Sequence, residues 1–155
     1  HNIMPPAAKT TGNYANSTLA KMEALNAGYD EAIMLNGAGL VSECSGENIF
    51  VAKGDVILTP PTSSGALPGI TQHTVMTLAA DQGIDIQVGD LARSDLYTAD
   101  EIFVVGTAAE VSAVNSVDDR PVPCPGPATK VLADAYADLV RGRNETYRAW
   151  NELAS

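Results

Sequence analysis

The sequence predicts an α/β domain in which a mixed, largely antiparallel sheet or pseudobarrel is flanked by helices. First, 155 residues with 45% hydrophobic content are enough to bury one core. Second, segments with a helical period alternate with short strand-like runs, and the regular strand-helix alternation of a doubly wound dinucleotide fold is missing. Third, no repeat, linker or low-complexity tract divides the chain. We therefore expect residues 1–155 to form one domain.

The first helix is predicted over Thr11–Asn26. Apolar side chains recur there at intervals of three to four residues, at Ala15, Leu19, Met22 and Ala24 or Leu25. Gly28 is the expected C-cap, because glycine readily adopts the left-handed backbone that ends many helices. The pattern is typical of an amphipathic helix.

Two hairpins are predicted next. Asn36-Gly37-Ala38-Gly39 favours a tight turn because its first residues tolerate positive φ, and Lys53-Gly54-Asp55 has the same role in the second hairpin. The four predicted strands are Glu31–Leu35, Leu40–Cys44, Asn48–Ala52 and Val56–Thr59. We expect them to form a four-stranded antiparallel meander.

Regular structure is then interrupted by Pro60, Pro61, Pro68 and Gly69. The elements expected after them are a helix that carries Val75, Leu78 and Ala79 and ends near Gly83, a strand over Ile84–Val88, an irregular or one-turn helical connection over Leu91–Asp100, a buried strand over Ile102–Val105 and a strand over Glu110–Val117. A long final helix has its predicted apolar stripe at Val131, Leu132, Ala135, Tyr136, Leu139 and Val140.

Charge and cysteine content exclude several classes of function. A net charge of −10 repels phosphate backbones and anionic lipid heads, so we expect neither nucleic-acid binding nor membrane association. No apolar run approaches the ~20 residues that cross a bilayer. Cys44 and Cys124 are expected to be free thiols in a cytoplasmic protein. His1 and His73 give no histidine metal site, and we expect no metal.

Two charged residues have surroundings that suit cofactor chemistry. Lys9 lies among small uncharged residues that could desolvate its amine, and such a lysine can form an imine with an aldehyde; an ordinary solvated lysine is the alternative, favoured on spacing alone. Glu43 lies in an apolar strand, where a carboxylate needs a cationic or hydrogen-bonding partner such as a protonated pyridine. The hairpin alternation equally allows Glu43 to face water.

Two glycine-containing turns could bind an anion. Leu67-Pro68-Gly69-Ile70-Thr71 leads into the second helix, so the N–H groups of Ile70 and Thr71 would converge at a positive helix end. A plain turn with Thr71 as the N-cap is the default alternative. Gly106-Thr107-Ala108-Ala109 leaves a buried strand and exposes N–H groups to a phosphate or a carboxylate, although a simple tight turn explains it too.

Four segments taken in order resemble the class IV pyridoxal-phosphate aminotransferases, and among them the branched-chain amino acid aminotransferases. The segments are Pro6-Ala7-Ala8-Lys9-Thr10-Thr11-Gly12-Asn13-Tyr14, Val41-Ser42-Glu43-Cys44-Ser45-Gly46-Glu47-Asn48-Ile49-Phe50, Thr59-Pro60-Pro61 with Ala66-Leu67-Pro68-Gly69-Ile70-Thr71, and Gly106-Thr107-Ala108-Ala109-Glu110. The resemblance covers nearly the whole chain, which corresponds to the C-terminal, cofactor-binding domain of fold-type IV enzymes. It implies that the family's N-terminal domain is absent from these residues.

The resemblance implies a role for each matching residue. Lys9 would bind pyridoxal 5'-phosphate covalently and move the proton, and Tyr14 would hydrogen-bond its phenolic oxygen. Glu43 would pair with the pyridinium nitrogen and keep the ring an electron sink. The phosphate would be held by Ile70, Thr71 and Thr107. The amides at Thr107 and Ala108 would also face the substrate carboxylate, and Glu47 is expected to be structural.

The implied reaction is the transamination of branched-chain L-amino acids (Leu, Ile, Val) with 2-oxoglutarate. Gly12-Asn13-Tyr14 favours this group over D-amino acid aminotransferases and aminodeoxychorismate lyases of the same class, which remain alternatives. A non-catalytic cofactor-binding domain is a further alternative. The five arginines come late and none matches the family's phosphate-binding arginine, so we expect this part to be nearly inactive alone. We also expect a homo-oligomer, based on a dimer, that meets the missing domain.

Overall fold

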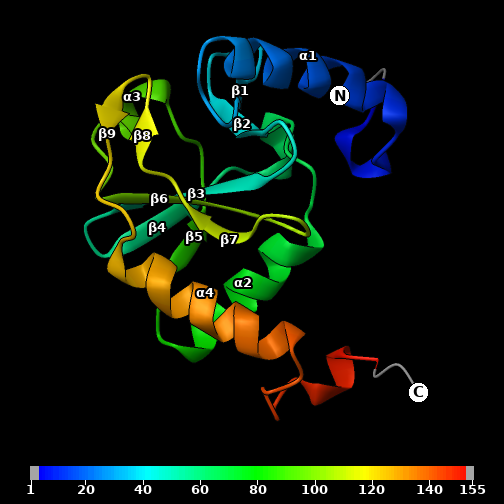
Figure 1. Ribbon diagram of the computed structural model, residues 1–155, viewed down its shortest axis with the longest axis vertical. Coiled ribbons are helices and arrows are strands. Elements are labelled where there is room, and N and C mark those ends of the chain that lie inside the picture. Colours follow the sequence, from blue (N-terminus) through cyan, green and yellow to red (C-terminus); the bar gives the residue numbers. More distant parts are fainter. Residues whose placement is uncertain (1–3, 153–155) are drawn as a thin grey trace.

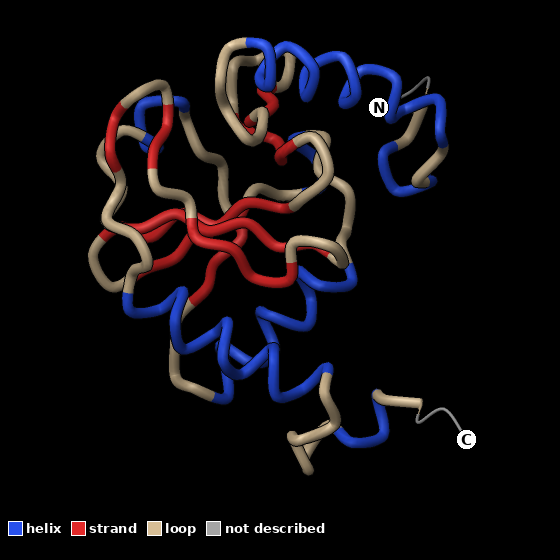
Figure 2. Tube along the Cα trace, in the orientation of Figure 1, coloured by secondary structure: helices blue, strands red, loops and turns tan. Residues whose placement is uncertain are grey.

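The computed structural model describes residues 4–152, which form three layers (Figure 1). A five-stranded sheet lies in the middle. Helices α2 (Ile70–Asp81) and α4 (Pro127–Val140) cover one of its faces. A hairpin, a one-turn helix and a small two-stranded sheet cover the other face, and α1 (Thr11–Asn26) lies outside them (Figures 1 and 2). The predicted α/β class with a mixed sheet is confirmed.

The central sheet is mostly antiparallel. Its strands are β3 (Asn48–Lys53), β4 (Val56–Thr59), β5 (Ile86–Val88), β6 (Glu101–Gly106) and β7 (Glu110–Ala113). They are ordered β5-β4-β3-β6-β7, and the β4–β5 pair is parallel. That pair is joined through α2, which forms a strand-helix-strand crossover. The two inner strands, β3 and β6, are antiparallel, with Asn48 opposite Val105 and Phe50 opposite Phe103.

Each face of the sheet carries its own hydrophobic cluster. Alternation along β3 sends Phe50 toward α2 and α4, where its ring stacks on that of Phe103 with centroids 4.8 Å apart. Ile49 and Val51 point to the opposite face and pack with Val41 of the hairpin. Because both faces are covered, the β3–β6 centre is buried on both sides, as predicted for Ile102–Val105.

The hairpin consists of β1 (Ile33–Leu35) and β2 (Val41–Cys44), and it forms a separate two-stranded sheet. The predicted four-stranded meander is therefore wrong, although all four strands exist. At the β2–β3 turn, a backbone hydrogen bond from Cys44 N–H to Glu47 C=O closes the connection without extending into a ladder. The hairpin instead folds over the sheet and closes the cluster around Val41 and Leu91.

The remaining elements mostly follow the sequence expectations. Between residues 4 and 152 they are α3 (Arg93–Leu96), β8 (Ser116–Val117), β9 (Arg120–Pro121) and the 3-10 turns Pro6–Ala8, Thr62–Ser64 and Arg148–Trp150. The single strand expected over 110–117 is wrong, because the chain leaves the sheet after Ala113 and pairs again as β8. In α4, Leu132, Tyr136 and Leu139 are buried as expected, whereas Val131 and Val140 are exposed.

Helix α1 ends where the sequence predicts, but its apolar stripe is not buried against the domain. Gly28 has φ +90, just after the C-cap Ala27. The predicted apolar face is exposed to solvent: Leu19 is 71% accessible, and Met22 and Leu25 are about half accessible. None of the helix's residues is buried. A helical period identifies an apolar stripe but not what the stripe contacts.

The structure also shows where the cysteines and His73 lie and whether a described helix could span a membrane. Cys44 is buried and Cys124 exposed, and both are free thiols. Across residues 4–152, no helix combines the length and apolar character needed to cross a membrane. His73 lies on the exposed side of α2, and His1 lies outside the described residues.

Candidate functional site

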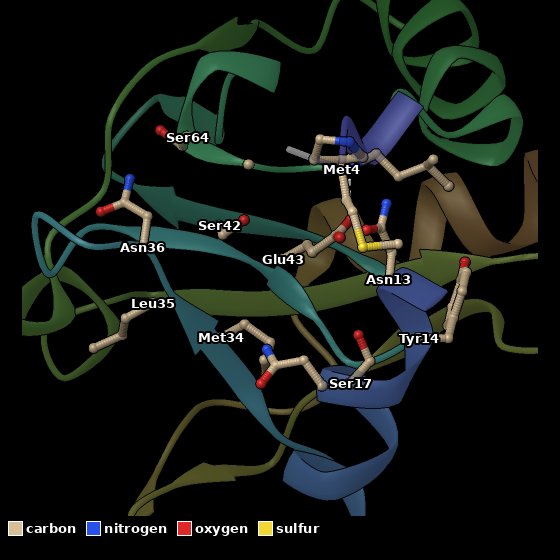
Figure 3. A pocket seen from close by; sticks show the side chains of 14 residues that line it. Met4, Asn13, Tyr14, Ser17, Met34, Leu35, Asn36, Ser42, Glu43 and Ser64 are labelled. Carbon is tan, nitrogen blue, oxygen red and sulfur yellow. Dashed lines mark hydrogen bonds between the residues drawn. The ribbon is translucent and has the colours of Figure 1, made fainter. Parts of the chain in front are cut away.

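A cavity of about 290 Å³ opens between α1, the β1–β2 hairpin and the loop that follows β4 (Figure 3). Asn13 and Tyr14 enter it from α1, Glu43 from β2, and Leu67 from the loop. Met4 also lines it, next to the start of α1 (Figure 3). The cavity therefore gathers residues from three segments that are far apart in the sequence.

Glu43 is the charged group of this cavity. Its side chain is half-buried, and its Oε2 accepts a hydrogen bond of 2.9 Å from the backbone N–H of Leu67. Burial raises the pKa of Glu43, while this hydrogen bond and the charge of Lys9 oppose the rise. Of the two sequence alternatives, the structure agrees with the one that gives the carboxylate a hydrogen-bonding partner, because Glu43 is half-buried and accepts from the Leu67 N–H.

Lys9 does not line this cavity; it lies in the peptide that joins the 3-10 turn Pro6–Ala8 to α1. Its backbone is left-handed, with φ 48 and ψ 42. Lys9 is exposed in these residues, which agrees with the solvated lysine that spacing alone favours and not with a desolvated amine. Its neighbours are small but leave the side chain uncovered. Lys9 and Tyr14 line an open hollow on α1 together with Leu19.

Tyr14 connects the two hollows. Its half-buried side chain lines both the cavity of Glu43 and the open hollow of Lys9. It lies in the first turns of α1, five residues after Lys9, so the helix fixes it relative to the lysine. Gly12 lies close to Met4, since a Cβ at that position would displace the end of the Met4 side chain. The structure thus brings Tyr14 and Glu43 to one cavity, and Lys9 to the adjacent hollow that shares Tyr14.

The N-terminus of α2 presents backbone N–H groups that no side chain of the described residues caps. The N-cap is Gly69, so the alternative of Thr71 as N-cap is wrong, and Thr71 is the second residue of the helix. Thr71 is buried and Ile70 is 87% accessible. A Cβ on Gly69 would collide with Asn48 Oδ1, and Asn48 Nδ2 donates to Leu67 C=O at 2.8 Å. Asn48 therefore fixes the loop that leads into the helix.

The turn after β6 lies at the same end of the sheet. Thr107 and Ala108 are exposed in the tight connection between β6 and β7. A Cβ on Gly106 would touch Glu47 Cγ at 3.3 Å, and β3 pairs Asn48 with Val105. Because Asn48 also contacts Gly69, the 107–108 turn and the start of α2 are both next to the beginning of β3. Neither lines the 290 Å³ cavity.

Sequence reasoning missed two positioning residues. Asn48 was assigned only as the first residue of a strand, and its amide arranges the loop that the site uses. The sequence predicts Glu31 only as the first residue of a strand, whereas in the structure it accepts hydrogen bonds from Lys21, Ala32 N–H and Ser45 N–H. A polar residue directly beside an apolar run was the available signal in both cases.

The fold and this cavity have the form of a small-molecule-binding α/β domain, with a pocket built from a helix, a hairpin and a loop. Comparison with known protein families identifies the family to which the chain belongs. The model of the amino-transferase class IV family matches residues 1–117, and the chain belongs to that family.

Individual relatives agree with this family. The probable branched-chain-amino-acid aminotransferase of Aquifex aeolicus is 46% identical over 152 residues, which is 96% of this chain and 49% of that protein. The structure of a branched-chain aminotransferase from Thermoproteus uzoniensis with norvaline matches with a TM-score of 0.93 at 47% identity, over 96% of this chain and 50% of that one.

A third comparison is with the structure of a branched-chain amino acid aminotransferase from T.th. complexed with N-(5'-phosphopyridoxyl)-L-glutamate. It has a TM-score of 0.92 and 46% identity, again over 96% of this chain and 50% of that one. The chain therefore spans about half the length of the relatives it matches.

Proposed function

We propose that this chain is the cofactor-binding part of a pyridoxal-phosphate-dependent aminotransferase that acts on branched-chain L-amino acids with 2-oxoglutarate. The observation that carries the proposal is the half-buried Glu43 carboxylate, which lines one cavity with Tyr14 and lies within electrostatic reach of Lys9. The names of the relatives support the substrate class, and the phosphopyridoxyl-glutamate ligand of the T.th. structure supports both the cofactor and glutamate as a product.

The residues present fit pyridoxal phosphate. A desolvated carboxylate that meets a backbone N–H but no cation of the described chain suits a protonated pyridine nitrogen, which Glu43 would hold. The uncapped N–H groups of Ile70 and Thr71, at the positive end of a 12-residue helix, suit a phosphate, with Thr107 beside them. When bound, the cofactor supplies an electron sink that acidifies the substrate Cα–H. The cavity of about 290 Å³ is near the lower limit for such a ligand, as expected if further walls come from elsewhere.

Lys9 is the proposed proton carrier. Its Nζ would hold the cofactor between turnovers and, as a free amine, would take a proton from the substrate Cα and later give it back. An amine that moves between two positions needs room, and the exposed position of Lys9 is compatible with that movement.

Tyr14 and Glu43 would act on the ring. The Tyr14 hydroxyl would donate to the phenolic oxygen, which fixes the ring's tilt. Glu43 would keep the ring nitrogen protonated, since an adjacent negative charge favours the charged form of a base. Leu67 N–H restrains the Glu43 oxygen, so the carboxylate is oriented before any ligand arrives.

The 107–108 turn is the proposed seat of the substrate carboxylate. Thr107 and Ala108 expose their backbone at the end of β6, next to the start of α2 where the phosphate would bind. Backbone N–H groups bind carboxylates through short charge-assisted hydrogen bonds. This arrangement would orient the amino acid Cα toward Lys9 but leave the choice of side chain to other walls.

An N-terminal domain is proposed to complete the site. Each of the five arginines has a partner elsewhere: Arg93 with Asp118, Arg120 with Tyr97, Arg141 with Glu110, Arg143 with Asp138 and Arg148 with Glu145. None of them lines the cavity. A cation for the phosphate would then come from the domain that covers the apolar face of α1. We propose a cytoplasmic homo-oligomer, based on a dimer, for the complete enzyme.

The test uses the complete protein. Absorbance should show a bound imine chromophore, and incubation with L-leucine and 2-oxoglutarate should yield glutamate. Activity with D-amino acids, or lyase activity without glutamate formation, would favour the other class IV reactions. A chromophore without any turnover would favour a non-catalytic cofactor-binding domain.

A further inference from the structure

Helix α1 carries Tyr14 and follows Lys9, yet it is held to the rest of the domain by few groups. None of its residues is buried. Within residues 4–152, Lys21 is the one α1 residue whose side chain hydrogen-bonds to the segments that follow the helix: its Nζ donates to Asp30 C=O and to Glu31 Oε2, both at 2.6 Å. The orientation of α1 therefore depends strongly on Lys21 and on whatever holds Glu31.

Glu31 is held from three sides. Besides Lys21, its Oε1 accepts hydrogen bonds from Ala32 N–H at 2.7 Å and from Ser45 N–H at 3.1 Å. Burial raises the pKa of Glu31, but the hydrogen bonds from Lys21 and Ser45 outweigh it and bring the value to about 2. Glu31 is therefore a carboxylate that joins α1 to the turn between β2 and β3.

Glu47, on the same turn, is the carboxyl group that Glu31 contacts. Its Oε2 is buried and has no hydrogen-bond donor in the described part of the chain. Burial raises the pKa of Glu47 and the nearby Glu31 raises it further, while Lys21 and the backbone N–H of Gly46 oppose the rise. An ionised Glu47 would leave this buried oxygen without a donor, which is costly, whereas a carboxylic acid can donate its proton to Glu31.

We propose that Glu47 is a neutral carboxylic acid that donates a hydrogen bond to Glu31, and that Lys21, Glu31 and Glu47 form a relay that positions α1 against the turn at Gly106. The relay rests on the proposed function for its role: it would set Lys9 and Tyr14 relative to Glu43 and the 107–108 turn. Its residues are positioning residues, because none of them lines the 290 Å³ cavity.

The relay joins two parts of the fold. Lys21 lies in the second half of α1, and Glu47 Cγ lies beside Gly106, where an added Cβ would approach it to 3.3 Å.

Three other charged or titratable groups surround Glu31 and Glu47. They are Lys21 on α1, Asp30 before β1, and Cys44 on β2, a buried thiol whose pKa is raised by burial and by these carboxylates. If Glu47 ionised, two carboxylates would share one ammonium group.

The first test measures stability against pH and needs no cofactor. The folded-state pKa of Glu47 is raised, so its contribution is complete at low pH and is lost as the pH rises through that value. Glu47→Gln keeps a neutral donor, so between about pH 5 and pH 8 the urea midpoint should fall less in this variant than in the parent. The raised pKa of Glu43 contributes equally to both proteins.

Glu23→Gln is the matched control, because Glu23 is an exposed carboxylate on α1. It should keep the parental slope. Infrared spectra over the same pH range should show a protonated-carboxyl component that fades as the pH rises in the parent and in Glu23→Gln, and that is missing from Glu47→Gln. Identical pH slopes for the parent and Glu47→Gln, or no band lost, would overturn the proposal.

The second test measures positioning. Lys21→Met removes the charge-assisted hydrogen bonds to Asp30 and Glu31, so it should speed hydrogen exchange of α1 amides by about tenfold or more, while β3 and β6 stay protected. In the complete enzyme, Glu47→Ala should alter the circular dichroism of the bound cofactor, and Glu47→Gln should restore it. Unchanged exchange, or no rescue by Gln, would contradict the relay. Failure to bind cofactor would contradict the proposed function but leave the stability and exchange results standing.

Discussion

Glu43 and Leu67 are joined by a hydrogen bond of 2.9 Å across 24 positions of sequence. The bond runs from the Leu67 N–H to Glu43 Oε2, and Asn48 Nδ2 holds the Leu67 C=O on the other side of the same residue. One loop residue thus links the carboxylate of the hairpin to the strand of the central sheet. The carboxylate is oriented by groups that belong to the chain itself.

Glu43→Gln should show whether the side chain at position 43 acts through its hydrogen bond to Leu67 or through its negative charge. A glutamine oxygen can still accept from Leu67 N–H, but it cannot hold a proton on the ring nitrogen. In the complete enzyme, kcat should fall by about two to three orders of magnitude, with a smaller loss of cofactor affinity. Steady-state kinetics and cofactor titration measure the two effects. Near-normal turnover would show that Glu43 is only a strand residue.

Lys9→Ala should abolish transamination and remove the covalently bound cofactor. Borohydride reduction followed by peptide mapping of the parent should place the label on Lys9. The other lysines serve as internal controls: Lys21 is paired with Glu31, Lys53 lies beside the β3–β4 turn, and Lys130 lies on α4. A label on any of these three would refute the assignment.

Gly69→Ala should disturb the start of α2. The new Cβ would collide with Asn48 Oδ1, so either the loop or the amide must move. We expect a loss of about 1–3 kcal/mol in unfolding free energy and weaker binding of inorganic phosphate. Gly37→Ala is the control, since a Cβ there meets no atom within 4 Å. Equal urea midpoints for the two variants would show that the contact is not a constraint.

Glu101→Ala should destabilise the domain without touching the site. The buried Glu101 carboxylate accepts from Ala128 N–H at 3.1 Å, from Thr129 N–H at 2.9 Å and from the Thr129 hydroxyl at 2.7 Å, which satisfies the first turn of α4. Leaving those donors unpaired should cost about 2–4 kcal/mol, measured by urea unfolding. Asp134→Ala, a change on the same helix away from these contacts, should change little. A loss below about 1 kcal/mol for Glu101→Ala would mean that water replaces the carboxylate.

The sequence predicted the helices and strands more accurately than the contacts that these elements make with one another. Local signals were sufficient for α1, α2 and both hairpins, because turn glycines and helical periods depend on neighbouring residues alone. The four-stranded meander failed because the choice between continuing a sheet and folding a hairpin over it depends on the cluster around Val41 and Leu91, which are 50 positions apart in sequence. The sequence also does not predict that the apolar stripe of α1 is exposed, because its exposure depends on which distant segments pack against the helix.

In the candidate site, too, the sequence predicts individual residues but not the contacts that support them. Residue order and motif were enough to select Lys9, Tyr14 and Glu43 as candidates, and the structure brings them near one cavity. The position of Asn48 and Glu31 beside apolar runs is a local signal for these residues, but it does not identify their partners. The contact of Asn48 with the loop at Gly69 and that of Glu31 with Lys21 join residues that are distant in the sequence.

The left-handed backbone at Lys9 has a consequence for how this protein can change. A side chain at φ 48 costs roughly 1–2 kcal/mol, which glycine would avoid, and the exposed Lys9 recovers nothing by burial. A library of variants selected only for resistance to heat should therefore enrich glycine at position 9, whereas one selected for growth that requires the reaction product should keep lysine. If Lys9 has the proposed role, backbone stability favours glycine at this position and the reaction favours lysine, so the two selections should yield different residues.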